Sequence, residues 1–476
     1  MFSARPQFYL QWRAALQPSG TLRDDSTPPE ALLQNIWHHQ RILRDELKLA
    51  DGRVVRVLHP GFWNHGAGPD FRDAVLQFAG EPPVTGDVEI DLDSSGWKSH
   101  GHDRNPNFQN VKLHVVWEGD VRLKIPTLTL KSFLDAPLVE LALWLTTDLA
   151  KQYPEELLGQ CAAPLREVTG VQLAQLLNEA ALVRFQRKAA DLHSRARQVG
   201  WEQALWEGML RALGYKQNVW PMQRIGELRA RLATGDGSLV PMQARLLGVS
   251  GLLPNDLTRR QRSADNYLRT VWDHWWRERD AFSDCALPRN LWRLNGLRPA
   301  NHPQRRLALA ANWAGDASLF KRIDKWLVTM QPDHALADSL LACLQPPSDE
   351  FWSRHWTLRS ARTPKPHPLL GAARLTDLAV NVVLPWQWLR AREGGNAKLL
   401  AEAERRYFAW PAAEDNAVLR LARDRLLGGR RDVKLTNAAM QQGLLQIVRD
   451  FCNHSNALCA DCKFPELVRN WRISAT

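Results

Sequence analysis

The pattern of hydrophobic and polar positions along the chain changes in character near residue 140. Before that point, short apolar or alternating runs predict strands over residues 53–58, 71–78, 84–92, 111–117 and 121–130. The last two runs flank Glu118-Gly119-Asp120, which predicts a hairpin. Upstream, Thr27-Pro28 and Glu30 form a helix-start signal, and the apolar spacing that follows predicts a helix over residues 28–49.

Beyond residue 140 the apolar residues follow helical spacing, with Gly and Pro between the segments. Helices are predicted over residues 138–148, 171–197, 201–212, 221–233, 262–280, 304–311, 316–329, 335–344, 375–392, 397–408, 416–427 and 437–452. The fold class is therefore α+β, an N-terminal α/β domain followed by a large, mostly α-helical region. We divide the chain into a polar lead-in (1–27), an α/β domain (28–140), a helical domain (141–345) and a helical C-terminal region (346–476).

Composition narrows the class of protein. Hydrophobic residues make up 45% and charged residues 24% of the 476 residues, as in a globular protein. No apolar run reaches the 18 or so residues that a membrane-spanning helix needs, so we expect no membrane association. The N-terminus lacks an apolar segment with a cleavage site, which predicts a cytoplasmic protein. The sequence predicts no oligomeric state.

The net charge of +11 is unevenly distributed. Residues 1–135 hold 15 Lys and Arg against 17 Asp and Glu, a balance of −2, so the remainder carries +13. An acidic region that binds a cation beside a basic body that attracts phosphates would give this distribution, which makes nucleic acid a candidate partner. A basic housekeeping protein without such a partner is the alternative.

The strongest chemical signal is the run Asp87-Val88-Glu89-Ile90-Asp91-Leu92-Asp93. On a strand, its alternation puts the four carboxylates on one face and the apolar residues on the other. Four like charges at every second position repel one another, and bound Mg²⁺ or Mn²⁺ would offset that repulsion. An ordinary strand with one solvated face is the alternative.

Other potential ligands surround this run in the sequence. Asp70 stands at the start of a predicted strand, where it could join Glu89 in holding an ion that polarises a phosphodiester. His100 and His102, on either side of Gly101, predict a tight turn that presents two imidazoles as ligands or as a general base. Histidines in an exposed loop are the alternative. Further histidines of this region are His59, His65 and His114.

These residues resemble the signature of a widespread bacterial family of unknown function: HPG…N…AGPDF, G(D/N)VEIH, S-S-D-W, HGH and N-V-x-L-H-V-V-W. The matching segments are 59–61, Asn64, 67–71, 86–90, Ser94-Ser95, Trp97, 100–102 and 110–117. The resemblance continues along most of the chain and implies no established activity.

Pro69-Asp70 followed by Glu89-Ile90-Asp91 is also similar, more distantly, to the pattern of PD-(D/E)XK nucleases. That resemblance implies a restriction-endonuclease-like N-terminal domain in which Asp70 and Glu89 bind the metal and Glu30 of the leading helix adds an acid. Two positions depart from the resembled signatures. Asp91 stands where the nucleases have Lys and the bacterial family has His, and Gly96 replaces the acid of S-S-D-W.

A second cluster of potential ligands, Cys452, Cys459 and Cys462, lies near the C-terminus. Its spacing resembles three of the four cysteines in the iron–sulfur loop of helix-hairpin-helix DNA glycosylases, but the fourth position holds Val468. His454 could instead complete a structural Cys₃His site for Zn²⁺. A degenerate site without metal remains open.

Three functions follow from these patterns. The first is a divalent-metal-dependent nuclease or phosphodiesterase with Asp70, Glu89, Asp91, His100 and His102 as its catalytic residues. The second is a non-catalytic nucleic-acid-binding or scaffold protein with a degenerate nuclease-like fold. The third is a different metal-dependent hydrolase in which His100 and His102 are the main ligands.

Overall fold

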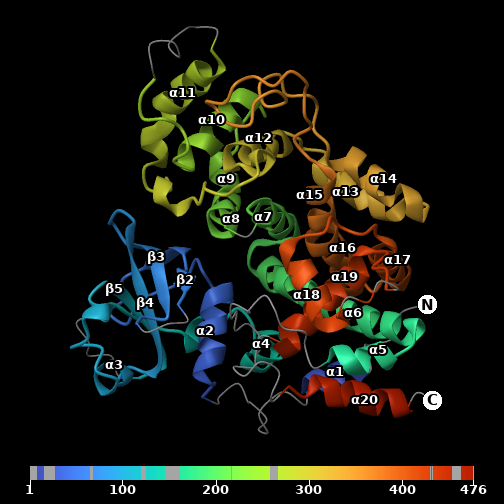
Figure 1. The fold of residues 1–476 in the computed structure, drawn as a ribbon. Helices are drawn as coiled ribbons and strands as arrows, with labels where there is room; N and C mark the ends of the chain where they lie inside the picture. The colour runs from blue at the N-terminus through green and yellow to red at the C-terminus, as the bar shows by residue number, and fades with distance from the viewer. Residues whose placement is uncertain are drawn as a thin grey trace.

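A small N-terminal sheet stands beside a larger body of helices in the computed structural model (Figure 1). The structure describes residues 8–14, 27–64, 68–119, 125–145, 161–215, 217–257, 266–428, 430, 433–452 and 462–474. This arrangement confirms the predicted α+β class, with a sheet followed by helices.

The sheet runs in the order β1-β3-β4-β5-β6, and β2 pairs with β3. Its strands are β1 (Val55–His59), β2 (Phe62–Trp63), β3 (Phe71–Phe78), β4 (Val84–Asp93), β5 (Val111–Glu118) and β6 (Thr127–Thr129). β1, β2 and β4 join the sheet in antiparallel pairs through β3, whereas β4–β5 and β5–β6 are parallel. The predicted hairpin is therefore wrong, because a hairpin needs antiparallel strands and β5 and β6 are parallel. Residues 120–124, which belong to the segment between these two strands, lie outside the described residues.

The central strand β4 follows the predicted alternation. Val88 and Ile90 are buried in one hydrophobic cluster with residues of α2 (Glu30–His39) and α4 (Leu138–Leu145). Because side chains alternate along a strand, Glu89 and Asp91 point to the opposite face. The same burial that fixes the strand register therefore fixes where the two carboxylates lie.

Helix α2 is shorter than the sequence predicts. It begins at Glu30 after Pro29, without a side-chain cap, and ends at His39 because Gln40 adopts a left-handed conformation (φ 51°). The backbone N–H of Gln40 donates to the carbonyls of Ile36 and Trp37 and closes the last turn. Ile42 and Leu47 are buried in irregular backbone, which accounts for the helical spacing that extended the prediction to residue 49.

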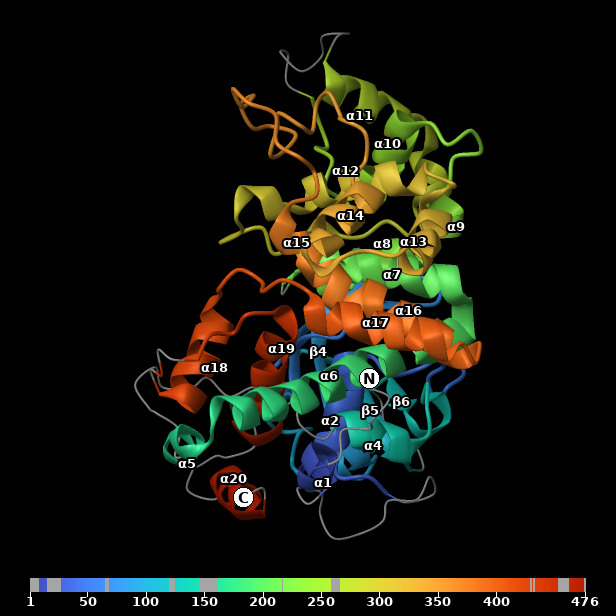
Figure 2. The same cartoon turned by 90° about the vertical axis from the view of Figure 1, so that its right-hand side faces the viewer.

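Helices form most of the rest of the described chain (Figure 2). They are α1 (Phe8–Ala14), α3 (Gly96–Ser99), α5 (Ala162–Glu167), α6 (Gly170–Val199), α7 (Trp201–Leu213), α8 (Val219–Glu227), α9 (Arg229–Leu232), α10 (Leu239–Val249), α11 (Tyr267–Glu278), α12 (Pro303–Ala314), α13 (Leu319–Val328), α14 (Leu336–Leu344), α15 (Ala372–Leu378), α16 (Leu384–Glu393), α17 (Ala397–Ala409), α18 (Ala417–Leu427), α19 (Ala438–Ile447) and α20 (Phe464–Ser474). Two π-helical segments, η8 (Ala379–Val383) and η9 (Val448–Cys452), continue α15 and α19. The 3₁₀ turns are η1 (Pro106–Phe108), η2 (Lys131–Phe133), η4 (Arg279–Phe282), η5 (Arg289–Leu291), η6 (Pro299–Asn301) and η7 (Asp333–Ala335).

Most predicted helices have a counterpart, with two kinds of difference. The segment predicted as one helix over 221–233 is divided at Leu228 into α8 and α9. The helices α1, α3, α5, α10 and α20 were not predicted. α1 lies in the segment interpreted as a polar lead-in, yet its Tyr9 and Trp12 are buried. The ring of Phe8 stacks on that of Trp471 of α20, with 4.7 Å between the ring centroids. None of the described helices is long and apolar enough to cross a membrane.

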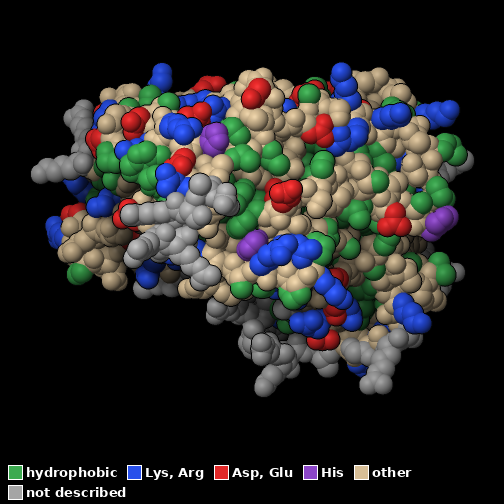
Figure 3. Space-filling model, turned by 90° about the horizontal axis from the view of Figure 1, so that it is seen from above, with side chains coloured by type: hydrophobic (Ala, Val, Ile, Leu, Met, Phe, Trp, Pro, Cys, Tyr) green, Lys and Arg blue, Asp and Glu red, His purple; other side chains and the backbone are tan. Residues whose placement is uncertain are grey.

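The charge surplus of the helical body does not gather into one patch on the face seen in Figure 3. Lys and Arg side chains there are dispersed among acidic and hydrophobic ones. Many arginines are instead buried. Arg406 is fully buried, and its two terminal nitrogens donate to the carbonyls of Trp326, Leu327 and Thr329 at the end of α13. Part of the positive charge therefore serves to satisfy backbone groups at helix ends.

Candidate functional site

Residues from four separate elements meet on the polar face of β4. Glu89 and Asp91 belong to β4, and Asp70 precedes β3. Glu30 opens α2, and His100 and His102 follow α3. The structure thus brings together Asp70, Glu89, Asp91, His100 and His102, with Glu30 close enough to interact electrostatically with Asp91.

Asp70 and Glu89 are joined through the backbone. The N–H of Asp70 donates to Oε2 of Glu89 at 3.0 Å, and the N–H of Ile90 donates to Oδ2 of Asp70 at 3.1 Å. Nε2 of Gln34, from α2, donates to Oδ1 of Asp70 at 2.9 Å. Both oxygens of Asp70 therefore already have donors, and this side chain is held firmly against β4.

Asp91 is the most enclosed acid of the group. Its side chain is 3% exposed, with Oδ1 3.1 Å from Nδ1 of His100 and Oδ2 2.9 Å from Nε2 of His114. A carboxylate only accepts hydrogen bonds, so we assign the donor role to both histidine nitrogens. The Asp91 carboxylate also fills the space beside Gly96, where an added Cβ would stand 2.6 Å from Cγ of Asp91.

The three side chains that could share one cation are Asp91, His100 and His102. A ligand atom of each lies within 4.8 Å of the others. Nε2 of His102 lies 3.3 Å from Oε1 of Glu89, but within the described chain both ring nitrogens of this histidine are buried without a hydrogen-bond partner. The His100 side chain is 56% exposed. The group therefore combines buried carboxylates with one histidine that reaches solvent.

Burial and mutual repulsion raise the pKa of three acids here, Asp70, Glu89 and Glu30. Burial raises the pKa of Asp70 to about 7, with a smaller contribution from the charge of Glu30. Burial and then the charge of Asp70 raise the pKa of Glu89 to about 9. The pKa of Glu30 is raised by burial and by Asp91. Burial lowers the pKa of His102, which favours the neutral imidazole that binds metals.

Neighbouring charged residues have structural partners instead. Asp87 accepts from the N–H of Asp73 at 3.1 Å, and Asp93 accepts from the N–H of Ser95 at 2.8 Å. His59 is buried, its Nδ1 accepts from the N–H of Gly61 at 3.0 Å, and burial lowers its pKa to about 4. Of the four carboxylates predicted on one face of β4, only the middle two reach the cluster. His65 lies outside the described residues.

Two contributors were not among the predicted site residues. His114 is fully buried and lies opposite Glu89 because β4 and β5 pair in parallel. Gln34 reaches Asp70 from the second turn of α2. His114 could have been found from the sequence, because it stands in an apolar predicted strand, and a buried polar side chain there needs a hydrogen-bond partner.

The C-terminal cysteine cluster is only partly described. Cys452 is buried at the end of η9, and Sγ of Cys462 lies 3.9 Å from the carbonyl oxygen of Phe451. His454 and Cys459 lie outside the described residues. The predicted structural Zn²⁺ site therefore stays a prediction.

Comparison with known proteins gives one match. A protein family described as "Protein of unknown function (DUF2851)" matches residues 30–416. No curated protein matches the chain. No solved structure matches it either. Because the family match spans well over half of the chain, including the sheet and most of the helical body, the protein belongs to the family of unknown function DUF2851.

Proposed function

We propose that the protein is a divalent-metal-dependent nuclease or phosphodiesterase that acts on nucleic acid. The observation that carries the proposal is the meeting of Glu89, Asp91, His100 and His102 in one cluster, with Asp70 bonded to Glu89. Buried acids that repel one another are costly unless a cation balances them. The raised pKa values of Asp70, Glu89 and Glu30 therefore support a cation-binding role over a purely structural one.

The donor set fits Mn²⁺ better than Mg²⁺. Asp91 offers a carboxylate oxygen and His100 and His102 offer imidazole nitrogens, whereas Mg²⁺ prefers oxygen ligands alone. The Nδ1 atom of His102, buried without a hydrogen-bond partner in the described chain, also fits a site that needs a ligand. A bound divalent ion would polarise a phosphodiester and lower the pKa of its water. Asp70 and Glu30 would add negative potential beside that ion.

The residues around the ligands have separate roles in this proposal. Asp91 orients His100 through Nδ1 and holds the buried His114 on its other oxygen. His100, which is half-exposed, is the ligand of this group that a substrate can approach from solvent. Glu89 lies beside His102, 3.3 Å from its Nε2, and is fixed in turn by the N–H of Asp70.

The test is cleavage of single- and double-stranded DNA and RNA by the purified full chain with Mn²⁺ and with EDTA. Asp91→Asn and Glu89→Gln are expected to lower the rate about 100-fold or more. Asp93→Asn is the matched control, because Asp93 lies on the same strand but is bonded to Ser95 and not to the residues of the cluster. Cleavage that persists in both variants at the wild-type rate would overturn the proposal.

A second candidate is a metal-dependent hydrolase that acts on another substrate. The grouping of Asp91 with two histidines supports it, because mixed nitrogen and oxygen ligands also suit Zn²⁺. Elemental analysis of protein purified without added metal separates the two candidates. Zinc that is lost in His100→Gln and His102→Gln favours the second. Salt-sensitive binding of nucleic acid without metal or turnover would favour a non-catalytic role.

A further inference from the structure

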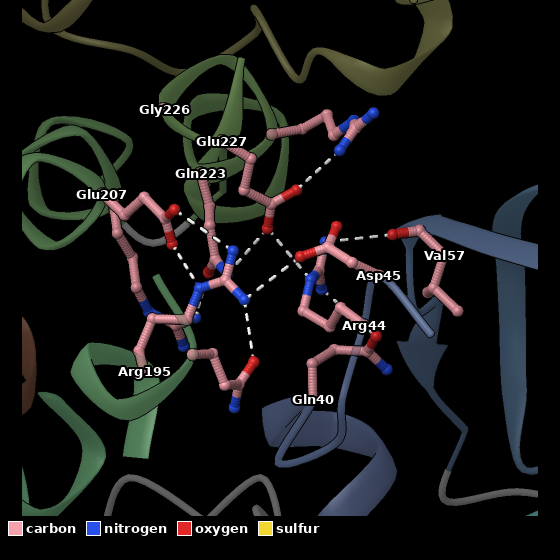
Figure 4. A network of polar contacts seen from close by, with 12 residues as sticks. Gln40, Arg44, Asp45, Val57, Arg195, Glu207, Gln223, Gly226 and Glu227 are labelled. Atoms are coloured by element: carbon pink, nitrogen blue, oxygen red, sulfur yellow. Dashed lines mark hydrogen bonds and ion pairs between the residues drawn. The ribbon is translucent and has the colours of Figure 1, made fainter. Parts of the chain in front are cut away.

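A second polar cluster lies between the sheet and the helical body, built from residues other than those of the candidate metal centre. It surrounds a cavity of about 120 Å³ between the segment that follows α2 and the helices α6, α7 and α8. Its charged lining includes Arg41, Arg44, Arg195 and Arg211, together with Asp191 and Glu207. Figure 4 shows part of this network.

Three of the lining arginines are paired with acids. Arg41 binds Asp135 at 2.8 Å and Asp191 at 2.7 Å. Arg195 binds Glu207 at 2.7 Å, and the two side chains face each other in Figure 4. These pairs fix the walls of the cavity by linking the segment after α2 to α6 and α6 to α7.

Glu227 of α8 ties the third arginine to the same network. Nε of Arg44 lies 3.0 Å from Glu227, and Arg224 approaches the other oxygen of that carboxylate at 2.9 Å. Arg44 also donates to the carbonyl of Val57 on β1 at 3.1 Å. One acid therefore serves two guanidinium groups, which leaves positive charge in excess at this point.

The fourth arginine is near acids but is paired with none of the described ones. Within the described chain Arg211 forms no ion pair. It donates to Oε1 of Gln223 at 2.5 Å and lies 4.5 Å above the ring of Trp220, which Arg44 also approaches at 5.6 Å. Two guanidinium groups thus share one aromatic ring.

Further donors in and beside the cavity are unsatisfied. Nη2 of Arg41 and Nε of Arg187 are both buried and have no hydrogen-bond partner among the described residues. The Arg41 and Arg187 residues are 4% and 6% exposed. A buried donor without a partner is costly, so such groups usually mark a place where a ligand or ordered water binds.

Lowered pKa values of basic groups near the cavity also indicate an excess of positive charge. Burial, with Arg44 and Arg187 nearby, lowers the pKa of Arg211 to about 10 despite the opposing effect of Asp191. Burial and the neighbouring arginines Arg187 and Arg184 lower the pKa of Lys188 to about 7. The protein alone therefore does not balance the positive charge collected around α6 and α7.

We propose that this cavity binds a phosphate group through Arg211, Arg41 and Arg44. Several guanidinium groups approaching from different elements suit a tetrahedral, multiply charged oxyanion, because each can donate to a different oxygen. The lining amides of Gln40, Gln198 and Gln223 can complete its hydrogen bonds. The ligand is free phosphate or the phosphate of a small molecule. The proposal does not depend on the nuclease activity, because none of these residues belongs to the metal cluster.

The test is isothermal titration of the full chain in EDTA with inorganic phosphate, and separately with a nucleoside monophosphate. Chloride at matched ionic strength controls for screening, and EDTA prevents phosphate from binding through a metal ion. Saturable binding with one site per chain is the expected result. Tighter binding of one of the two ligands identifies the source of the phosphate group. No saturable binding of either ligand would overturn the proposal.

Two variants locate the binding. Arg211→Met is expected to weaken binding about 10-fold or more, because it removes a charged donor. The melting temperature of Arg211→Met in phosphate-free buffer should be unchanged or raised, because Arg211 forms no ion pair with a described acid. The substitution therefore leaves no buried acid without its ion-pair partner. Arg229→Met is the matched control, since Arg229 also lies over aromatic rings, Trp206 and Phe320, but does not line the cavity. Equal losses in both variants would refute this location.

Discussion

Replacing Glu89 by Gln is expected to stabilise the metal-free protein at neutral pH. Burial and the charge of Asp70 raise the pKa of Glu89 to about 9, whereas an unfolded chain gives Glu a pKa near 4.3. At pH 7 the folded protein must therefore bind a proton that the unfolded chain has released. Each pH unit between the unfolded pKa and pH 7 corresponds to about 1.4 kcal/mol, so folding with Glu89 costs about 4 kcal/mol at pH 7.

The sign of the pH dependence follows from the same difference. Because the folded-state pKa lies above the unfolded one, the unfolding free energy falls as pH rises from about 4 to about 9. Gln has no proton to bind, and its carbonyl can still accept from the N–H of Asp70. Glu89→Gln should therefore remove most of this slope and raise stability by up to about 4 kcal/mol at pH 7. Asp70 shares the same repulsion, so the effects of the two acids are not additive.

The assay is hydrogen–deuterium exchange of peptides from β3 and β4 in EDTA between pH 5.5 and 8, corrected for intrinsic exchange. A local measurement suits this chain, because a protein with three hydrophobic clusters need not unfold in one step. Glu81→Gln, an exposed acid between the same two strands, is the control and should change little. Equal protection of β4 in Glu89→Gln and wild type at pH 7 would refute the reasoning. Under the proposed function, saturating Mn²⁺ makes β4 better protected in wild type than in Glu89→Gln, because the ion stabilises ionised Glu89.

Three further substitutions test other parts of the structure. Under the proposed function, Gly96→Ala should lower Mn²⁺ affinity about 10-fold by displacing Asp91, as measured by metal titration. Arg406→Met should destabilise the helical body by about 3 kcal/mol in urea unfolding, because it strands three buried carbonyls. Asp450→Asn should release α1, with a loss of about 3–5 kcal/mol seen as faster proteolysis near residue 14, because Arg13 loses its buried charge partner at 3.1 Å.

Regular elements with strong local signals were predictable. The strand 71–78 matches β3 at both ends. The helix predicted over 171–197 corresponds to α6, which Thr169 and Gln172 begin with a capping box. The prediction for 28–49 failed because Ile42 and Leu47 keep helical spacing while their backbone is irregular. Burial by distant elements, which periodicity cannot distinguish from helix formation, produced that pattern.

The candidate site shows a similar division. Alternation along β4 sufficed to put Glu89 and Asp91 on one face, and Gly101, at φ 73°, does form the expected turn between His100 and His102. The hydrogen bond from His114 to Asp91 could not be predicted, because it depends on parallel pairing of β4 with β5. Strand order and direction are set by long-range packing rather than by the local sequence.

Asp91 and Gly96 are the two positions where this sequence differs from the family and nuclease signatures that it resembles. The two residues are adjacent in the structure. The Asp91 carboxylate stands where the side chain of residue 96 would begin. An acid at position 96 and an acid at position 91 would therefore compete for the same space. The chain carries Asp at 91 and Gly at 96, which keeps one carboxylate in that space instead of removing it. The loss of the acid from S-S-D-W is thus no argument against a metal site, because its charge is supplied from β4.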